Sequence, residues 1–497
     1  MLERHALRTG RAAGHCRLVI VLTIIFAGLA GVFSARAASS EDPTPTRTGG
    51  DSPPRTSDSN DTGDKPRVTE TPKVEPPKSA DAPKPCDGLP PYTFSYNNGL
   101  YATVAGYAGI KDVEVRSQRQ IKLIVEGFRK PMPIRAVIQN HVAPLVVVIL
   151  GLDGKADGKL GRLWPAWLGA NGFHVLTFDS TFMAQFTAIS GHGVTGNVLV
   201  EGERVSQIVG AFLKSGEMRN NVSQVGIVGM SFGGLEALVI GQMAKDKKLP
   251  FQVDAIQAYS PPIRLARTGA LIDQWYEQDR WNYTLAELAN KLSDHKPVPP
   301  GATPPFSDSL MRAGIAAMFH LGLADVVIKN DSEYHLGLLP SGSQYDDPYV
   351  KQDYAETWGY EKFMSEMSFP YWKRRQNLKD LSDMLDPIDL CNLVVRQPAY
   401  SETILSVDDP FNTSDDLADL KTCAKDARVT FLPTGGHLGF VGDPWTKAKL
   451  LSIFRCTAVN NAAALSPAPA PAAEKQPAPE PAPAPTPELQ PAPDASR

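Results

Sequence analysis

Continuous runs of aliphatic and β-branched residues recur through the middle of the chain. They lie at residues 145–150 (LVVVIL), 174–178 (HVLTF), 225–228 (VGIV) and 253–259 (VDAIQAY), and each is followed closely by glycine, aspartate or serine. Short apolar runs without polar alternation are typical of strands buried on both faces of a sheet. A helical period separates some of them, most clearly at residues 201–213. Strands alternating with helices predict an α/β fold with a mostly parallel central sheet and helices on both faces.

The segments on either side of this core carry weaker strand signals. From residue 86 to about residue 140 the pattern is strand-like, with partial alternation at 119–125 (RQIKLIV), which predicts antiparallel edge strands. The stronger pattern resumes at 402–407 (ETILSV) and 428–432 (RVTFL), and a helix over 446–454 is expected to close the fold.

The alternation of strands and helices is interrupted between about residues 263 and 390. This stretch has helical pieces, proline-rich breaks and many aromatic residues, which predicts a cap inserted after the sixth strand of the sheet. The aromatic residues either line an apolar substrate pocket or form the small core of the cap itself. They are Trp275, Tyr276, Trp281, Tyr283, Trp358, Tyr360, Phe363, Tyr371 and Trp372.

The first 37 residues have the pattern of a secretory signal peptide. A basic stretch precedes the apolar run at residues 18–33, and Ala35-Arg36-Ala37 supplies an A-x-A cleavage site. The apolar run is shorter than the roughly 20 residues of a spanning helix. We therefore expect an exported protein, periplasmic or secreted, with an uncleaved N-terminal membrane anchor as the alternative.

Two segments have compositions that do not support a packed core. Residues 38–85 are rich in Pro, Thr, Ser, Asp and Lys, which predicts a disordered linker. Residues 461–497 form a Pro/Ala-rich tail, which favours extended polyproline conformations and is suited to act as a spacer towards the cell wall or envelope. The folded domain is therefore expected within residues 86–460.

Four cysteines remain after removal of the predicted signal peptide, which contains Cys16. Export permits disulfides, and four cysteines allow three connectivities. We favour Cys391–Cys423 and Cys86–Cys456, because the first two flank one strand unit and the last two lie near the ends of the folded region. Unpaired buried thiols are the alternative. The cysteines and histidines form no metal-binding spacing, so no metal is expected.

Composition narrows the range of partners. The chain of 497 residues is 42% hydrophobic and 21% charged, with a formal net charge of −4, so no basic surface for nucleic acid is expected. The loop at residues 154–159 (GKADGK) lacks the spacing of a phosphate-binding loop and the Ser or Thr after its lysine. No cofactor is predicted.

Residues 225–238 (VGIVGMSFGGLEAL) combine a strand, a tight turn and a helix, with Ser231 at the apex. The turn matches the G-x-S-x-G nucleophile elbow, in which a strained backbone holds the serine hydroxyl clear of the sheet. Gly229 and Gly233 have no Cβ and allow the strand and the helix to pass closely. The alternative is a glycine-rich turn with a helix-capping serine.

Four motifs in this order resemble the α/β-hydrolase superfamily. They are GLDG at 151–154, GMSFG at 229–233, DDPF at 408–411 and GGHLGF at 435–440. The resemblance covers residues 90–458, and the last two motifs are similar to the carboxylesterase-like branch. It implies an α/β-hydrolase fold and a Ser-His-Asp triad in the chain order nucleophile, acid, histidine.

The resemblance implies that Ser231 is the nucleophile and His437 the general base and acid. A serine hydroxyl needs a neighbouring base, and imidazole accepts and returns protons near neutral pH. His437 is the only histidine after the pair Asp408-Asp409. The family acid directly precedes the Pro-Phe pair, which favours Asp409 as the carboxylate that orients the imidazole, and Asp408 is the fallback.

The backbone N–H groups of Phe232 and, by resemblance, Leu152 are expected to form the oxyanion hole. The chain departs from the common pattern here. Leu150 stands where many relatives have histidine, and Asp153 brings a carboxylate close to the hole. We expect Asp153 to point away and to cap the local turn. His295, His320 and His335 are expected to be surface or hydrogen-bonded residues of the cap.

These features predict an exported serine hydrolase that cleaves a carboxylic ester through an acyl-enzyme. The substrate is expected to be a small-molecule ester, and the aromatic cap favours an apolar acyl or aryl group. A peptidase or a thioesterase would use the same triad, because one fold hosts many functions. A non-catalytic exported binding module on the same scaffold is the alternative from another class.

Overall fold

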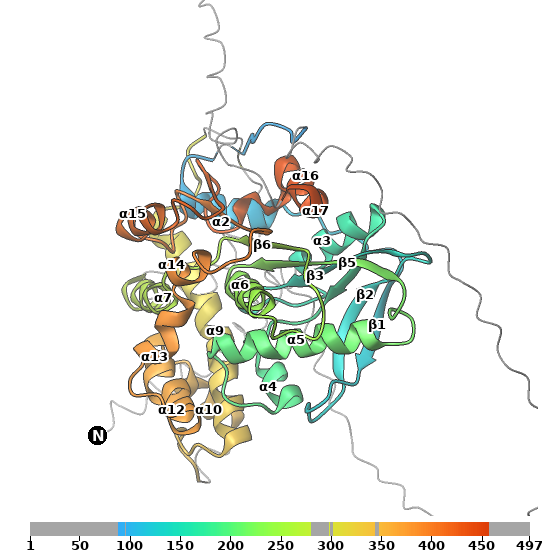
Figure 1. Cartoon of the computed structure of the whole chain (residues 1–497). Helices are drawn as coiled ribbons and strands as arrows, with labels where there is room; N and C mark the ends of the chain where they lie inside the picture. The colour runs from blue at the N-terminus through green and yellow to red at the C-terminus, as the bar shows by residue number, and fades with distance from the viewer. Residues whose placement is uncertain (1–87, 95, 280–297, 299–301, 343–346, 457–497) are drawn as a thin grey trace, which may run out of the picture.

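The computed structural model describes residues 88–94, 96–279, 298, 302–342 and 347–456 (Figure 1). The predicted signal peptide, the linker and the Pro/Ala tail lie outside the described residues, as do Trp281, Tyr283 and His295.

The strands of the described residues form one eight-stranded sheet in the order β1-β2-β4-β3-β5-β6-β7-β8. Strand β2 is antiparallel to β1 and β4, whereas every pair from β4 to β8 is parallel. The strands are β1 (Gln118–Leu123), β2 (Met132–Val137), β3 (Ala143–Ile149), β4 (His174–Thr177), β5 (Val222–Met230), β6 (Ala255–Tyr259), β7 (Ser401–Ser406) and β8 (Val429–Leu432).

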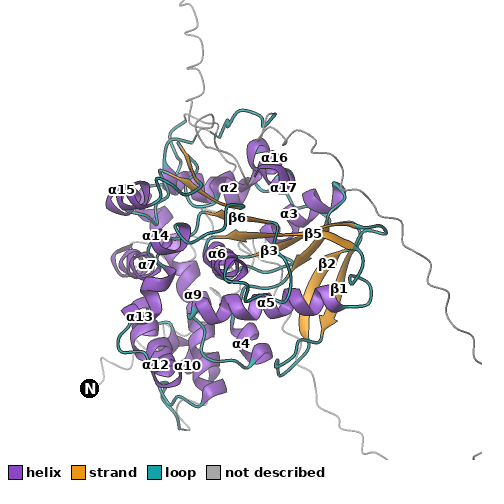
Figure 2. Ribbon diagram, in the orientation of Figure 1, coloured by secondary structure: helices purple, strands orange, loops and turns teal. Residues whose placement is uncertain are grey.

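Helices cover both faces of the sheet (Figure 2). The two largest hydrophobic clusters of the described residues include side chains from opposite faces of the sheet. The sequence of strand β3 is continuously apolar because both of its faces are buried. Val147 packs into one core, and Val146 and Val148 pack into the other. The helices outside the cap are α2 (Gly99–Gly109), α3 (Lys159–Ala170), α4 (Ala184–Ser190), α5 (Val198–Lys214), α6 (Phe232–Lys245), α15 (Ser414–Cys423), the short 3-10 segment η5 (Gly439–Gly442), α16 (Pro444–Leu451) and α17 (Ile453–Cys456).

The chain between β6 and β7 is helical and forms the cap, beside α6 in Figure 1. Its helices are α7 (Leu265–Asp279), α9 (Asp308–Tyr334), α10 (Pro348–Ala355), α11 (Tyr360–Lys362), the π-helical segment η3 (Phe363–Ser368), α12 (Phe369–Gln376), α13 (Ser382–Leu385), the 3-10 segment η4 (Asp386–Ile388) and α14 (Leu390–Val394). A mostly parallel sheet covered on both faces, with this insertion, is the α/β-hydrolase fold that the sequence predicts.

The strand-like interpretation of residues 86 to about 140 is wrong for its first part. Helix α2 occupies Gly99–Gly109 and is capped by Asn98, whose side chain accepts a hydrogen bond from the Tyr101 N–H. Small residues allow the helix to touch the chain after β8, since a Cβ on Gly106 would lie 2.0 Å from the Gly439 carbonyl oxygen. This close backbone contact is a tertiary requirement, which local alternation does not reveal.

A disulfide joins Cys391 of α14 to Cys423 of α15, which confirms the first predicted pairing. The pairing of Cys86 with Cys456 falls outside the described residues, because Cys86 and the side chain of Cys456 are not among them.

Among the described helices, α9 alone has the length and hydropathy of a membrane span. Within the most apolar window of α9, 61% is buried inside the protein, as expected of a core helix.

We predict that Gly106→Ala lowers the free energy of unfolding by about 1–3 kcal/mol, because the added methyl group has to push α2 away from Gly439. Urea unfolding followed by circular dichroism would measure this change. Gly216→Ala is the matched control, since a Cβ there meets no atom within 4 Å. Equal stability of the two variants would contradict the close packing of α2.

Candidate functional site

Ser231 lies at the end of β5 and directly before α6, in a backbone conformation that non-glycine residues rarely adopt. Its φ is 52° and its ψ is −120°. Close packing explains the two flanking glycines. A Cβ on Gly229 would lie 2.0 Å from the Gly233 carbonyl oxygen, and a Cβ on Gly233 would lie 2.5 Å from that of Leu150. Positive φ at a non-glycine residue costs free energy and persists only where the surroundings impose it.

The structure brings Ser231, His437 and Asp409 into one hydrogen-bonded series. The Ser231 Oγ lies 2.9 Å from the His437 Nε2, and the His437 Nδ1 lies 2.8 Å from the Asp409 Oδ2. Asp409 is 2% exposed and His437 8%, whereas Ser231 keeps more accessible surface. A proton can therefore pass from the hydroxyl to the imidazole while the buried carboxylate holds the other ring nitrogen.

The loop that carries His437 is held by residues that the sequence interpretation missed. The His437 N–H donates to the Thr103 Oγ1 of α2 at 2.8 Å, and the Ser406 hydroxyl donates to the Gly436 carbonyl at 2.5 Å. Thr103 lies more than 300 positions away along the chain, in a segment predicted as strand-like, so no local signal identified it.

Asp408 and Asp409 have different surroundings. The Asp408 Oδ1 accepts a hydrogen bond from the Gly436 N–H at 2.8 Å, so this carboxylate holds the histidine loop rather than the imidazole. Burial raises the pKa of Asp408 above its ordinary value, while the hydrogen bond from Gly436 works in the opposite direction. Of the two candidates, Asp409 is the one that contacts the His437 ring.

Phe411 is a second residue that the sequence interpretation did not assign. Its N–H donates to the Asp409 Oδ1 at 3.0 Å, and its ring meets the His437 ring edge-on at a centroid distance of 4.6 Å. The same ring contacts Trp275 and Phe319 of the cap. Phe411 therefore connects the cap to both Asp409 and His437.

The predicted oxyanion residues lie on either side of Ser231. Phe232 is the first residue of α6, where backbone N–H groups have no partner within the helix and the helix dipole favours negative charge. The loop that contains Leu152 packs on Ser231, because a Cβ on Gly151 would lie 3.5 Å from the Ser231 Oγ. The assignment of both N–H groups to an oxyanion hole remains a prediction.

Asp153 lies against the cap. Among the hydrogen bonds of the described residues, none joins its carboxylate to its own turn, so the expectation that Asp153 caps this turn is wrong. The turn closes through a Gly154 N–H to Gly151 carbonyl bond, and the Asp153 carboxylate packs on Gly322 of α9, where an added Cβ would lie 1.9 Å from Oδ2. Burial, followed by the nearby charge of Asp325, raises the pKa of Asp153 to about 7, although Lys155 acts in the opposite direction.

Most of the described cap aromatics are buried, which favours the interpretation that they form part of the core. Trp358 is 1% exposed and belongs to the packed core. Tyr360 and Phe363 reach towards the site through Phe182, with ring centroids 6.2 and 5.7 Å away, and Phe182 contacts Phe232 at 5.5 Å. A row of buried rings packed on one another therefore extends from the cap to the residue after Ser231.

The described cap histidines are not part of the site. His320 is buried, its Nε2 lies 3.0 Å from the Asp273 Oδ1, and its ring stacks on Tyr276. His335 ends α9 in a left-handed conformation. Within the part of the chain that the structure describes, no group of three or more His, Cys, Asp or Glu side chains is arranged to hold a metal ion.

Comparisons with known proteins give only distant structural similarity. No protein-family model matches the chain, and no curated protein matches it. An esterase from Pyrococcus furiosus aligns at 12% identity over 67% of this chain and 88% of its own, with a TM-score of 0.37. An acylaminoacyl peptidase from Pyrococcus horikoshii aligns at 11% identity over 70% of this chain and 41% of its own, with a TM-score of 0.35. TM-scores this low say nothing about activity.

We predict that Asp153→Asn weakens the pH dependence of stability. A raised pKa means that the folded protein binds this proton more tightly than the unfolded chain, so the stabilisation is complete below pH ~4 and is lost as the pH rises through about 7. Between pH 5 and pH 8.5 the wild type should lose on the order of 2 kcal/mol more than the variant, because one pKa unit corresponds to about 1.4 kcal/mol.

Urea unfolding at the two pH values would measure this difference. Glu201, whose pKa burial also raises to about 7, contributes equally to both proteins and cancels. Asp353→Asn, at an exposed position, is the control. Identical pH profiles for the wild type and Asp153→Asn would contradict the raised pKa of Asp153.

Proposed function

We propose that this protein is an exported serine hydrolase that cleaves a carboxylic ester through an acyl-enzyme intermediate. The observation that carries the proposal is the hydrogen-bonded series from the Ser231 Oγ through His437 to Asp409, built on a strained turn at the end of β5. Such a series is costly to assemble from three separated segments and has a direct use in acyl transfer.

In the first half of the reaction, the Ser231 Oγ attacks the ester carbonyl carbon while the His437 Nε2 accepts the hydroxyl proton. Asp409 holds the Nδ1–H and stabilises the imidazolium that forms. The negative charge on the former carbonyl oxygen is stabilised by the N–H groups of Phe232 and Leu152. His437 then returns the proton to the leaving alkoxide as the C–O bond breaks, which leaves Ser231 acylated.

In the second half, water replaces the alcohol. His437 takes a proton from the water as it attacks the acyl-enzyme, a second tetrahedral intermediate forms, and the proton returns to the Ser231 Oγ as the acid is released. Every step uses residues of this chain and needs no cofactor.

The surroundings of Ser231 support the choice of substrate class. Phe182, Phe232, Tyr360 and Phe363 form a contiguous buried aromatic group that begins at the residue after Ser231, and these apolar surroundings support an apolar acyl or aryl group. A peptidase or a thioesterase would use the same groups. An ester is the first choice over a peptide because alkoxides leave more readily than amines. It is the first choice over a thioester because the motifs at 408–411 and 435–440 resemble the carboxylesterase-like branch.

The location of the protein is part of the proposal. The signal-like pattern of residues 1–37 supports export to the periplasm or beyond, and the Cys391–Cys423 disulfide is compatible with an oxidising compartment. The Pro/Ala tail at residues 461–497 is then a spacer towards the cell wall or envelope.

We predict that a fluorophosphonate probe labels the wild type and leaves Ser231→Ala unlabelled. The probe forms a bond only to a serine hydroxyl that a neighbouring base activates. Hydrolysis of a short-chain aryl ester should fall by about 10⁴-fold or more in the variant. In-gel fluorescence and a chromogenic ester assay provide the two measurements.

A folded wild type that takes no label would support the binding-module alternative. Label that persists in Ser231→Ala would identify a different nucleophile. Matched ester, thioester and peptide substrates with one acyl group separate the three hydrolase classes, and the ester should give the highest kcat/KM.

We predict that Asp409→Asn lowers kcat by about 10³- to 10⁴-fold, because the amide no longer holds the productive imidazole tautomer. Asp408→Asn should cost less than about ten-fold, since an amide oxygen can still accept the Gly436 N–H. Steady-state kinetics of the two variants, with circular dichroism as a check on folding, would test the assignment. The reverse order of effects would identify Asp408 as the acid.

A further inference from the structure

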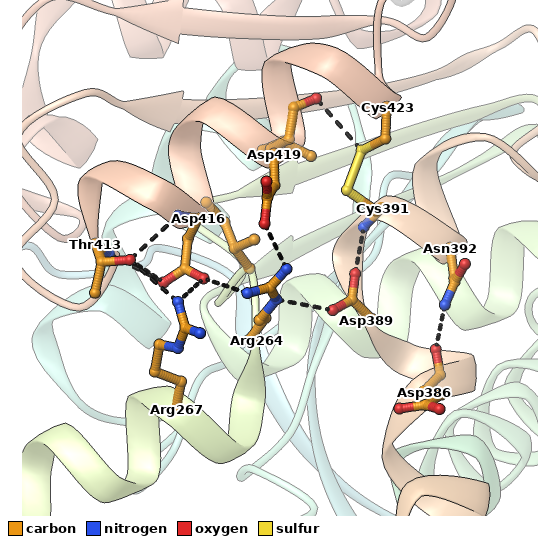
Figure 3. Close-up of polar contacts among 12 residues, drawn as sticks. Arg264, Arg267, Asp386, Asp389, Cys391, Asn392, Thr413, Asp416, Asp419 and Cys423 are labelled. Carbon is orange, nitrogen blue, oxygen red and sulfur yellow. Dashed lines mark hydrogen bonds and ion pairs between the residues drawn. A yellow bond between two sulfur atoms is a disulfide. The ribbon is translucent and has the colours of Figure 1, made fainter.

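We propose that Arg264 and Asp416 are positioning residues that hold the loop at 409–413, and with it Asp409, in place beneath the cap. This inference rests on the proposed function of Asp409. We call the group formed by Arg264, Asp389, Asp416, Asp419 and the Cys391–Cys423 disulfide the cap clamp (Figure 3).

Arg264 stands where the chain enters the cap, between β6 and α7, and contacts three carboxylates from two other segments. Its Nη2 lies 2.6 Å from Asp419, its Nη1 3.3 Å from Asp416, and its Nε 3.5 Å from Asp389. Figure 3 shows the guanidinium between the helices that carry these residues. A planar guanidinium can direct several donors at once in a fixed arrangement, which a lysine cannot do.

Asp416 is the buried member of the clamp, at 2% exposure. Its Oδ1 pairs with both Arg264 and Arg267, and its Oδ2 accepts hydrogen bonds from the Thr413 N–H and hydroxyl at 3.1 and 2.8 Å. The Thr413 Oγ1 accepts the Asp416 N–H in return, which completes a capping box at the start of α15. A buried carboxylate with two cationic partners fixes this end of the loop.

The start of the cap also contacts the loop directly. The Ile263 N–H donates to the Asn412 Oδ1 at 3.2 Å, and the Thr268 hydroxyl donates to the Phe411 carbonyl at 3.3 Å. The Phe411 N–H in turn donates to Asp409. Residues on both sides of Arg264 therefore contact the residues that immediately follow Asp409.

The end of the cap returns to the same place. The Leu390 N–H donates to the Ile263 carbonyl at 3.0 Å, and the disulfide ties α14 to the last turn of α15. Asp389 caps α14 through the Cys391 N–H and also pairs with Arg264. The two ends of the cap and helix α15, which follows the loop at 409–413, therefore meet at Arg264.

Kinetics of Arg264→Ala test the positioning role. We expect kcat for an aryl ester to fall about ten-fold, because a small displacement of a catalytic group is enough for such a loss, while KM changes by less than about two-fold. Arg264→Lys should recover only part of kcat, since one ammonium cannot span three carboxylates. Arg396→Ala, at an exposed arginine near the end of the cap, is the matched control and should leave both constants unchanged.

Hydrogen exchange gives a second readout that does not depend on activity. Peptides covering residues 409–413 should exchange faster in Arg264→Ala than in the wild type or in Arg396→Ala, because the loop loses its support. Asp419→Asn provides a milder variant if Arg264→Ala does not fold. It removes the negative charge from the partner in the shortest contact of Arg264 and leaves Asp416 paired, so a smaller increase in exchange and a smaller loss of kcat are expected.

The outcomes separate the two proposals. Unchanged exchange at 409–413 in both Arg264→Ala and Asp419→Asn would overturn the clamp, whatever the activity. Faster exchange with unchanged kcat would overturn the positioning role. A wild type that does not react with fluorophosphonate would overturn the proposed function, while the exchange data would still decide whether Arg264 holds the loop.

Discussion

The strained turn at Ser231 is the constraint to which the surrounding fold is fitted. A serine with φ of 52° is stable only if β5, α6 and the end of β3 pack closely around it, and they do so through glycines at positions where a Cβ has no room. The parallel strands place the carboxyl ends of β5, β7 and β8 along one edge of the sheet, so the loops carrying Ser231, Asp409 and His437 begin near one another.

The convergence of the strands does not by itself give the hydrogen-bond geometry of Ser231, His437 and Asp409. Two additional supports hold the loops that carry these residues. The Thr103 hydroxyl of helix α2 accepts a hydrogen bond from the His437 N–H. Residues at the start of the cap donate hydrogen bonds to the segment after Asp409. Both supports come from outside the sheet. The precision of the site therefore depends on elements outside the sheet as well as on the strands.

Two partly buried acids lie close to the site. Asp153 and Asp408 lie within a few residues of the proposed oxyanion and acid groups, and burial raises the pKa of each. Their different partners explain their different roles. Asp408 accepts the Gly436 N–H and fixes the histidine loop, whereas Asp153 packs against the backbone of α9 and links the loop at residues 151–154 to the cap.

The sequence by itself determined the parallel sheet, the elbow at Ser231, and Ser231, Asp409 and His437 as candidates, because continuous apolar runs and glycine-bounded turns are local consequences of burial and backbone sterics. It also favoured the Cys391–Cys423 pair. Only the tertiary structure decided that residues 99–109 form a helix, that Asp409 rather than Asp408 meets the imidazole, and that Thr103, Arg264 and Phe411 support the site. These are contacts between segments distant in sequence, and local periodicity carries no information about them.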